Sequence, residues 1–203
     1  MPPESPDALP LVAPVLVAWG NAWLSGHTGL DEAADRVEAV AGPTVANLPD
    51  DPNAEVTLRA FLAGLRSDGL TELRLALPAP GDPLGLSGPP SFNAAAVDAG
   101  QAAIAVLTAG PLGLVPALDL RGSSYVGVRL VVHESRPPRA DLPSVAEAER
   151  DLSIAMQSAT EALASVEGPA QERPDRLERL DRLGGELAPG YPGRAHRVCV
   201  PAT

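Results

Sequence analysis

The first part of the chain alternates stretches of apolar residues at helical spacing with glycine or proline breaks. Spacings of three and four residues indicate one buried side of an amphipathic helix, and glycine or proline marks where such a helix ends. The pattern predicts three helices, over residues 14–24, 31–41 and 52–68. In the third, Asp51 and Pro52 are expected to begin the helix, and its apolar side runs from Leu58 to Leu65.

The middle of the chain changes to a period of two, which is typical of a strand with one buried face. Leu73, Leu75 and Leu77 alternate with more polar residues directly after the third helix. A short helix is expected near residues 93–99, followed by strands over 102–108, 114–120 and 125–134. The turns between the last three strands are too short for crossover helices, so these strands are predicted to form an antiparallel meander.

Two further helices are predicted in the last third of the chain, over residues 145–166 and 174–187. The first has a continuous apolar stripe that steps by three and four residues: Val145, Ala148, Leu152, Ala155, Ala159, Ala162 and Val166. Its alanines permit close packing against the sheet or another helix. The second has leucines on one side, at positions 177, 180, 183 and 187, and residues 194–200 are expected to add an edge strand.

These elements predict an α+β fold in a single domain over residues 11–203. The expected architecture is an antiparallel sheet of four to five strands, with N-terminal helices and two C-terminal helices packed on it. Prolines at positions 2, 3, 6 and 10 make residues 1–10 a frayed lead-in. A doubly wound α/β fold is less well supported, because the meander lacks the alternating helices that a parallel sheet requires.

Composition and charge exclude several functions. The chain has 15 basic and 26 acidic residues, a net charge of −11, and every basic residue is arginine. Without lysine, the chain cannot form a phosphate-binding P-loop, a kinase site or a pyridoxal-phosphate site, and no cofactor is expected. The acidic balance and the low aromatic content, 3%, also argue against nucleic acid as a partner.

A cytoplasmic location is expected, because Cys199 is the only cysteine and secreted small domains usually contain paired cysteines. The apolar stretch over residues 9–19 contains Pro10 and Pro14, and no basic residue precedes Arg36. It therefore does not have the pattern of a signal peptide, and it is shorter than the roughly 20 apolar residues of a membrane helix. No membrane partner is expected.

The longest predicted connection, residues 78–91, is rich in proline and glycine and is the first candidate site. Long loops within compact domains are often functional, although a stiff connector would have the same composition. Its polar candidates are Asp82 and Ser87, with Asn93 just beyond it and His133 or Glu134 as further contributors. The sequence at 85–89 fails the nucleophile-elbow motif because Pro89 stands where glycine is required.

Trp19 and Trp23 form the second candidate site, because residues four apart lie on one face of a helix. Exposed, they would be natural hot spots for a partner; buried, they would anchor the first helix, and burial is the expectation favoured here. The three histidines are scattered along the chain, so neither a metal site nor a catalytic residue is assigned.

The sequence thus supports two hypotheses about function. The first is a non-catalytic protein-interaction or adaptor module that binds another protein through surface contacts, because no catalytic constellation is present. The second is an enzyme or small-ligand-binding protein with a site built around the 78–93 loop. A cleft on which the loop's polar side chains converge would favour the second hypothesis.

Overall fold

The computed structural model describes residues 9–48, 51–79, 81, 83, 85–121, 125–137, 145–164 and 188–191. These residues form five helices and six strands, which confirms the α+β class. The chain divides into two compact units, where the sequence predicts a single domain. The first comprises Met1–Pro138 and Gly185–Cys199, and the second comprises Arg139–Gly184 and Val200–Thr203.

The sheet of the first unit has six strands in the order β2-β1-β6-β5-β4-β3. Their bounds are Thr44–Leu48, Asp51–Thr57, Leu70–Ala76, Ala102–Leu107, Leu112–Arg121 and Tyr125–Glu134 for β1 to β6. The predicted meander is confirmed, because β4, β5 and β6 pair antiparallel in succession. The prediction of a wholly antiparallel sheet of four to five strands is wrong: β1 and β2 extend the sheet, and β1 runs parallel to β6.

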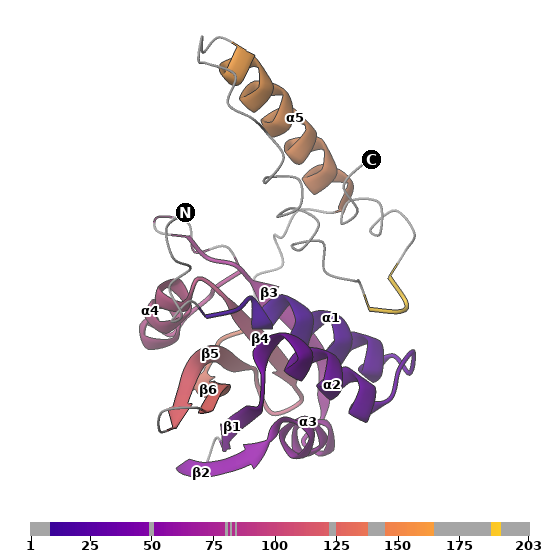
Figure 1. Cartoon of the computed structure of the whole chain (residues 1–203), viewed down its shortest axis with the longest axis vertical. Coiled ribbons are helices and arrows are strands. Elements are labelled where there is room, and N and C mark those ends of the chain that lie inside the picture. The colour runs from indigo at the N-terminus through magenta and orange to yellow at the C-terminus, as the bar shows by residue number, and fades with distance from the viewer. Residues whose placement is uncertain are drawn as a thin grey trace. The chain divides into compact units, whose positions relative to one another are not determined.

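Helices cover both faces of this sheet (Figure 1). The first three, α1 (Val12–Leu24), α2 (Leu30–Ala41) and α3 (Leu58–Ser67), share the main hydrophobic core with alternate residues of the strands, such as Ala103, Ala105 and Leu114. Helix α4 (Pro90–Ala99) packs with the residues between them, such as Ile104 and Val115, in a second core on the other face. This alternation follows from the period of two along a strand.

The predicted helix over residues 52–68 is wrong in its first half. Residues 51–57 form strand β2, which pairs antiparallel with β1. The helix begins only at Leu58, and the Thr57 side chain accepts a hydrogen bond from the Ala60 backbone as its N-cap. The apolar helical spacing begins at Leu58, so residues 51–57 have no helical signal to compete with strand pairing.

The sequence pattern placed Leu73, Leu75 and Leu77 on one buried face. Leu73 is buried, but Leu77 is 47% exposed because β3 ends at Ala76. Ala76 itself is buried in the second core, on the opposite face. Strand β3 is therefore covered on both faces, which a period-two pattern by itself does not reveal.

Two amide side chains fasten α1 to distant parts of the sheet. Gln101, 1% exposed, accepts a hydrogen bond from the Ala13 backbone and donates one to the Pro10 carbonyl oxygen. Asn21 binds both backbone groups of Leu73, with distances of 2.7 Å and 2.8 Å. Residues 1–8 of the predicted lead-in lie outside the described residues, whereas Pro10 is thus part of the fold.

The described part of the second unit is helix α5, Val145–Ala164. Its start matches the sequence prediction. The predicted helix over 174–187 and the predicted edge strand over 194–200 lie outside the described residues. Among the described helices, none combines the length and the apolar character needed to cross a membrane.

Candidate functional site

The proline-rich loop is fastened to the chain that follows β6. The Ser87 hydroxyl lies within hydrogen-bond distance of two carbonyl oxygens, that of Arg136 at 3.1 Å and that of Pro137 at 2.9 Å. The Arg136 backbone N–H donates to the Gly88 carbonyl oxygen at 3.0 Å. Ser87 therefore joins two segments of backbone that are far apart in the sequence.

Asn93, the next polar candidate, also binds the backbone of this loop. The side-chain oxygen of Asn93 accepts a hydrogen bond from the Gly88 backbone N–H at 3.0 Å, so it holds the turn that leads into α4. Leu86 is buried against Phe92 in the second core. Asp82 lies outside the described residues. The Ser87 side chain thus binds backbone carbonyl oxygens after β6, the Asn93 side chain binds the Gly88 backbone N–H, and neither carries an activated group.

His133 and Glu134 lie on opposite faces of β6, because neighbouring strand residues alternate. The His133 ring is tilted against Phe92, with 6.0 Å between ring centroids. Burial lowers the pKa of His133 below its ordinary value of 6.5, so its imidazole is neutral at neutral pH. The exposed Glu134 cannot act with it as an acid–base pair across the sheet.

The two tryptophans belong to the first unit's core and its margin. Trp19 is 5% exposed and packs with Ala22, Ala33 and Ala188, and the Arg36 guanidinium lies 4.7 Å from its ring centroid. Trp23 is partly buried, and Arg66 lies 4.9 Å from its ring centroid. Both rings are therefore already in contact with arginines of α2 and α3, and the Trp19 ring has little surface left for a partner.

A charged cluster on the sheet was not found by the sequence analysis. Glu55 of β2, Asp119 and Arg121 of β5 and Arg129 of β6 form it, and we call it the sheet ion-pair cluster. Arg121 reaches Glu55 at 2.5 Å and Asp119 at 2.8 Å. Arg129 reaches Asp119 at 3.1 Å and also pairs with Glu55. Strand register places these four residues on the same face of the sheet as α4.

The electrostatics of this cluster favour a structural role. Hydrogen bonds from Arg121 and Arg129 hold the pKa of Glu55 below its usual range, and the same arginines lower the pKa of Asp119, which is 5% exposed. The carboxylates in turn raise the arginine pKa values further. All four groups therefore stay charged near neutrality, and none is poised to exchange a proton there.

The sequence contains only part of the evidence for this cluster, because the pairing of its residues depends on the strand register. Asp119 and Arg121 alternate within a strand, but their partners are on β2 and β6, distant in the sequence. A metal-binding alternative gains no support, because the described residues contain no group of three or more His, Cys, Asp or Glu side chains suited to hold an ion.

Exposed apolar side chains occur on the β5–β6 hairpin and near the C-terminal end of α2. Leu120 and Val126 face each other across β5 and β6, and each is 58% exposed. Val40, 47% exposed, precedes Gly42 by two residues, and a Cβ on Gly42 would come 3.2 Å from the Val126 carbonyl oxygen. We call Val40, Leu120 and Val126 the hairpin patch. Large apolar side chains that neighbour one another in water are typical of contact surfaces.

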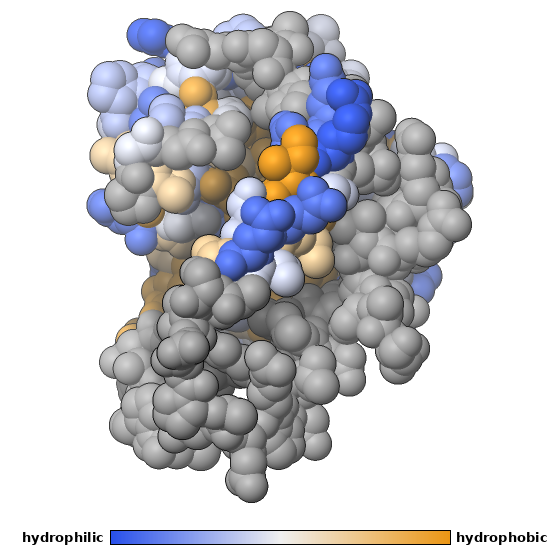
Figure 2. Space-filling model, turned by 90° about the horizontal axis from the view of Figure 1, so that it is seen from above, coloured by the Kyte–Doolittle hydropathy of each residue, from blue (hydrophilic) through white to orange (hydrophobic). Residues whose placement is uncertain are grey.

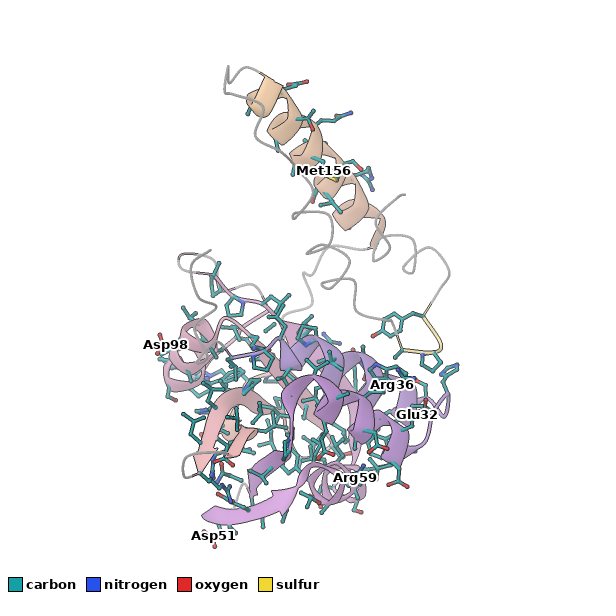
Figure 3. The ribbon with its side chains drawn as sticks, viewed as in Figure 1. Glu32, Arg36, Asp51, Arg59, Asp98 and Met156 are labelled. Atoms are coloured by element: carbon teal, nitrogen blue, oxygen red, sulfur yellow. The ribbon has the colours of Figure 1, made fainter. Side chains whose placement is uncertain are left out.

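Helix α2 carries an acidic face that is turned toward Arg59 of α3. Arg59 of α3 forms ion pairs with Asp31 at 3.3 Å, with Glu38 at 3.3 Å and with Asp35. Figure 3 shows Arg59 on α3 and the acidic Glu32 on α2. The Asp31 side chain nevertheless remains 90% exposed and that of Asp35 66%. One arginine therefore only partly neutralises the carboxylates of this face.

The first unit is thus an α+β body with a mixed six-stranded sheet, a structural charge cluster, exposed apolar side chains at the β5–β6 hairpin and an acidic face on α2. Residues 13–144 match the family model described as Rv1486c-like protein, N-terminal domain, and residues 146–203 match Rv1486c-like protein, C-terminal domain. The chain belongs to the Rv1486c-like protein family. Neither a curated protein nor a solved structure matches it.

Proposed function

We propose that this protein is a non-catalytic, cytoplasmic protein-binding module and that the hairpin patch is its contact surface. The exposure of Val40 and of the paired Leu120 and Val126 is the observation that carries the proposal. Burying a Val or Leu side chain is worth roughly 1.5–3 kcal/mol, so three such side chains can anchor a partner. A single cysteine in the whole chain supports the cytoplasmic location.

The partner is expected to present an apolar surface bordered by basic residues. The chain as a whole carries a net charge of −11, and the Asp31 and Asp35 side chains of α2 are largely exposed. Complementary charge at the rim of an interface mainly accelerates association and selects the partner. Binding should therefore weaken as the salt concentration rises.

The alternative function, an enzyme or small-ligand binder built around the 78–93 loop, has less support. Its polar candidates Ser87 and Asn93 are hydrogen-bonded to backbone groups. The neutral imidazole of His133 lies against Phe92. A catalytic role would require these groups to face a reacting atom, and their present partners are structural.

The test compares two variants in protein capture followed by calorimetry with the purified partner. The patch variant carries Leu120→Thr and Val126→Thr, because the β-branched threonine is well tolerated in strands. The control is Leu77→Thr, which changes an apolar side chain that is also exposed, 47%, after β3. We expect the patch variant to lose affinity by about tenfold or more, which corresponds to about 1.4 kcal/mol, and the control to bind as the wild type does.

Equal affinity of the patch variant and the wild type would overturn the proposed surface. Saturable binding of a small metabolite that Ser87→Ala or Asn93→Ala abolishes, with no captured protein surviving purification, would instead support the alternative function.

A further inference from the structure

Residues 188–191 of the first unit pack against the helix pair formed by α1 and α2 (Figure 1, yellow). Ala188 is fully buried in a cluster with Trp19 of α1 and Ala33 of α2. Tyr191 packs at the margin of the same cluster, and burial raises the pKa of its phenol above the ordinary value of 10.0. We call residues 188–191 the strap, because they pack against Trp19 from outside the helix pair.

The backbone of the strap is fixed by a proline and a glycine. Pro189 restricts its own φ, which lowers the entropy lost when the segment becomes ordered. Gly190 has a φ of 93°, a conformation that favours glycine, and a Cβ there would come 2.8 Å from the His27 ring. These two residues form a turn. The turn allows Ala188 and Tyr191, on either side of it, to reach the same buried cluster.

The strap contact is small compared with the packing beneath it. Pro189 and Gly190 are exposed and Tyr191 is half-buried, so Ala188 is the one fully buried residue of the four. The strap lies in the part of the chain that matches the C-terminal family domain, whereas Trp19 and its helix partners lie in the part that matches the N-terminal one. Small contacts between domains of one chain open readily. The strap can therefore leave the helix pair without unfolding it.

Opening the strap would uncover an aromatic surface with arginines beside it. With the strap in place Trp19 is 5% exposed, and the Arg36 guanidinium lies 4.7 Å from its ring centroid. Trp23, one turn further along α1, is partly buried, with Arg66 at 4.9 Å from its ring centroid. Tryptophan and arginine are the residue types that most often dominate binding energy. Among the described residues on the face seen in Figure 2, apolar areas are small and lie between hydrophilic ones, and uncovered tryptophans would contrast with that pattern.

We propose that the surface around Trp19 is a docking site for a short turn of the form small residue–Pro–Gly–aromatic, and that the strap is its reversible occupant within this chain. The structure gives a reason for each position: Ala188 has no room for a larger side chain, Gly190 lies against His27, and Tyr191 is half-buried. The strap thereby hides the site from proteins that present the same turn. The inference does not depend on the hairpin patch or on the proposed function.

Displacement of the strap in the full chain tests this proposal. In a Trp23→Phe background Trp19 is the only tryptophan, so its emission and its quenching by acrylamide report its exposure. Ala188→Asp would bury a carboxylate beside the indole, which is unfavourable. We therefore expect Trp19 emission to shift to longer wavelength and its quenching to rise. The control Pro189→Asp adds the same charge at an exposed position and should leave Trp19 as shielded as in the parent chain.

A second variant and a peptide complete the experiment. Gly190→Ala, which leaves Ala188 unchanged, should give a smaller shift in the same direction because its Cβ would meet the His27 ring. The capped peptide Ala-Pro-Gly-Tyr should restore the shielding of Trp19 in the Ala188→Asp chain at about millimolar concentration, the effective concentration that a short tether supplies. The peptide Asp-Pro-Gly-Tyr should require a concentration about tenfold higher or more.

Three results would overturn the proposal. Unchanged shielding of Trp19 in both Ala188→Asp and Gly190→Ala would show that the strap does not cover the indole. Loss of the folded circular dichroism spectrum in both variants would make the segment a part of the core and not a removable occupant. Exposure of Trp19 that the Ala-Pro-Gly-Tyr peptide leaves unchanged would show that the surface does not recognise the turn.

Discussion

Gln101 shows how one buried polar residue can organise the start of a distant helix, since its partner Ala13 lies 88 positions earlier in the sequence. No side chain near the start of α1 caps it, since the N-cap residue is Leu11. The Gln101 side chain supplies the missing acceptor to the Ala13 N–H at 2.9 Å and donates to the Pro10 carbonyl oxygen at 2.7 Å. Buried amides are retained where both ends of the amide find partners, as here.

Replacing Gln101 with alanine should lower the free energy of unfolding by about 2 kcal/mol. The change leaves the Ala13 N–H buried without an acceptor, which costs roughly 1–3 kcal/mol. Urea unfolding followed by circular dichroism measures the effect. Asp98→Ala, a change on the exposed side of α4 (Figure 3), should stay within about 0.5 kcal/mol of the wild type. Equal stabilities of the Gln101 variant and the wild type would contradict the capping role.

The candidate site residues Ser87 and Asn93 show what a residue type by itself can predict. Ser87 lies in a long loop and Asn93 just after it, and polar side chains at such positions are often functional. In the structure their hydrogen bonds are to the backbone around Gly88 and after β6. Polar side chains beside proline and glycine frequently satisfy backbone groups in this way. The residue types predict hydrogen bonding, whereas the identity of the partner depends on the fold.

At the scale of elements, β3 lies at an edge of the sheet and is protected there by α1. An open edge strand offers unpaired N–H and C=O groups that invite association with another chain. The Asn21 side chain occupies both groups of Leu73. The helix thus stabilises the strand and blocks the edge at the same point.

Asn21→Ala should destabilise the first unit by about 1–3 kcal/mol, because two hydrogen bonds are lost at once. Chemical denaturation gives the stability, and light scattering reports whether the freed edge causes association. Ser67→Ala is the control, since it removes an exposed hydrogen bond to the Ala63 carbonyl oxygen, and it should cost less than about 0.5 kcal/mol. An Asn21 variant as stable as that control would refute the edge contact.

The close approach of α4 to β5 depends on Gly113. A Cβ at this position would come 2.3 Å from the Phe92 ring, and Phe92 is fully buried. Gly113→Ala should therefore cost about 1–3 kcal/mol by overpacking, and adding Phe92→Leu should restore part of the loss. Thermal unfolding measures both variants. Gly64→Ala in α3, where a Cβ would meet no atom within 4 Å, should be neutral or slightly stabilising.

At the scale of the whole molecule, the sheet ion-pair cluster connects strands that are far apart in the sequence. Glu55 joins the edge strand β2 to arginines of β5 and β6, although β2 pairs only with β1 through its backbone. The cluster therefore ties the N-terminal part of the sheet to the meander. Its carboxylates must remain ionised for this tie to hold.

Stability should consequently fall in acid. The pKa values of Glu55 and Asp119 are lowered in the folded protein from ordinary values of 4.5 and 3.8, so the unfolded chain takes up protons first as the pH falls. The stabilisation is fully present above these ordinary values and is lost as the pH drops through the lower folded pKa values. Unfolding curves between pH 7 and pH 2 measure it. The Asp119→Asn variant should be less stable at pH 7, and its free energy of unfolding should change less with pH than that of the wild type. An unchanged slope of this free energy against pH would contradict the stabilising role of the cluster.

The sequence by itself determined the α+β class, the meander and most helices, because local periodicity records which face of an element is buried. It also determined that no lysine chemistry is available. The short strand β1, its parallel pairing with β6, the strand at 51–57 and the sheet ion-pair cluster were decided only by tertiary structure. These features depend on contacts between residues far apart in the chain, where the free energy of pairing outweighs local propensity.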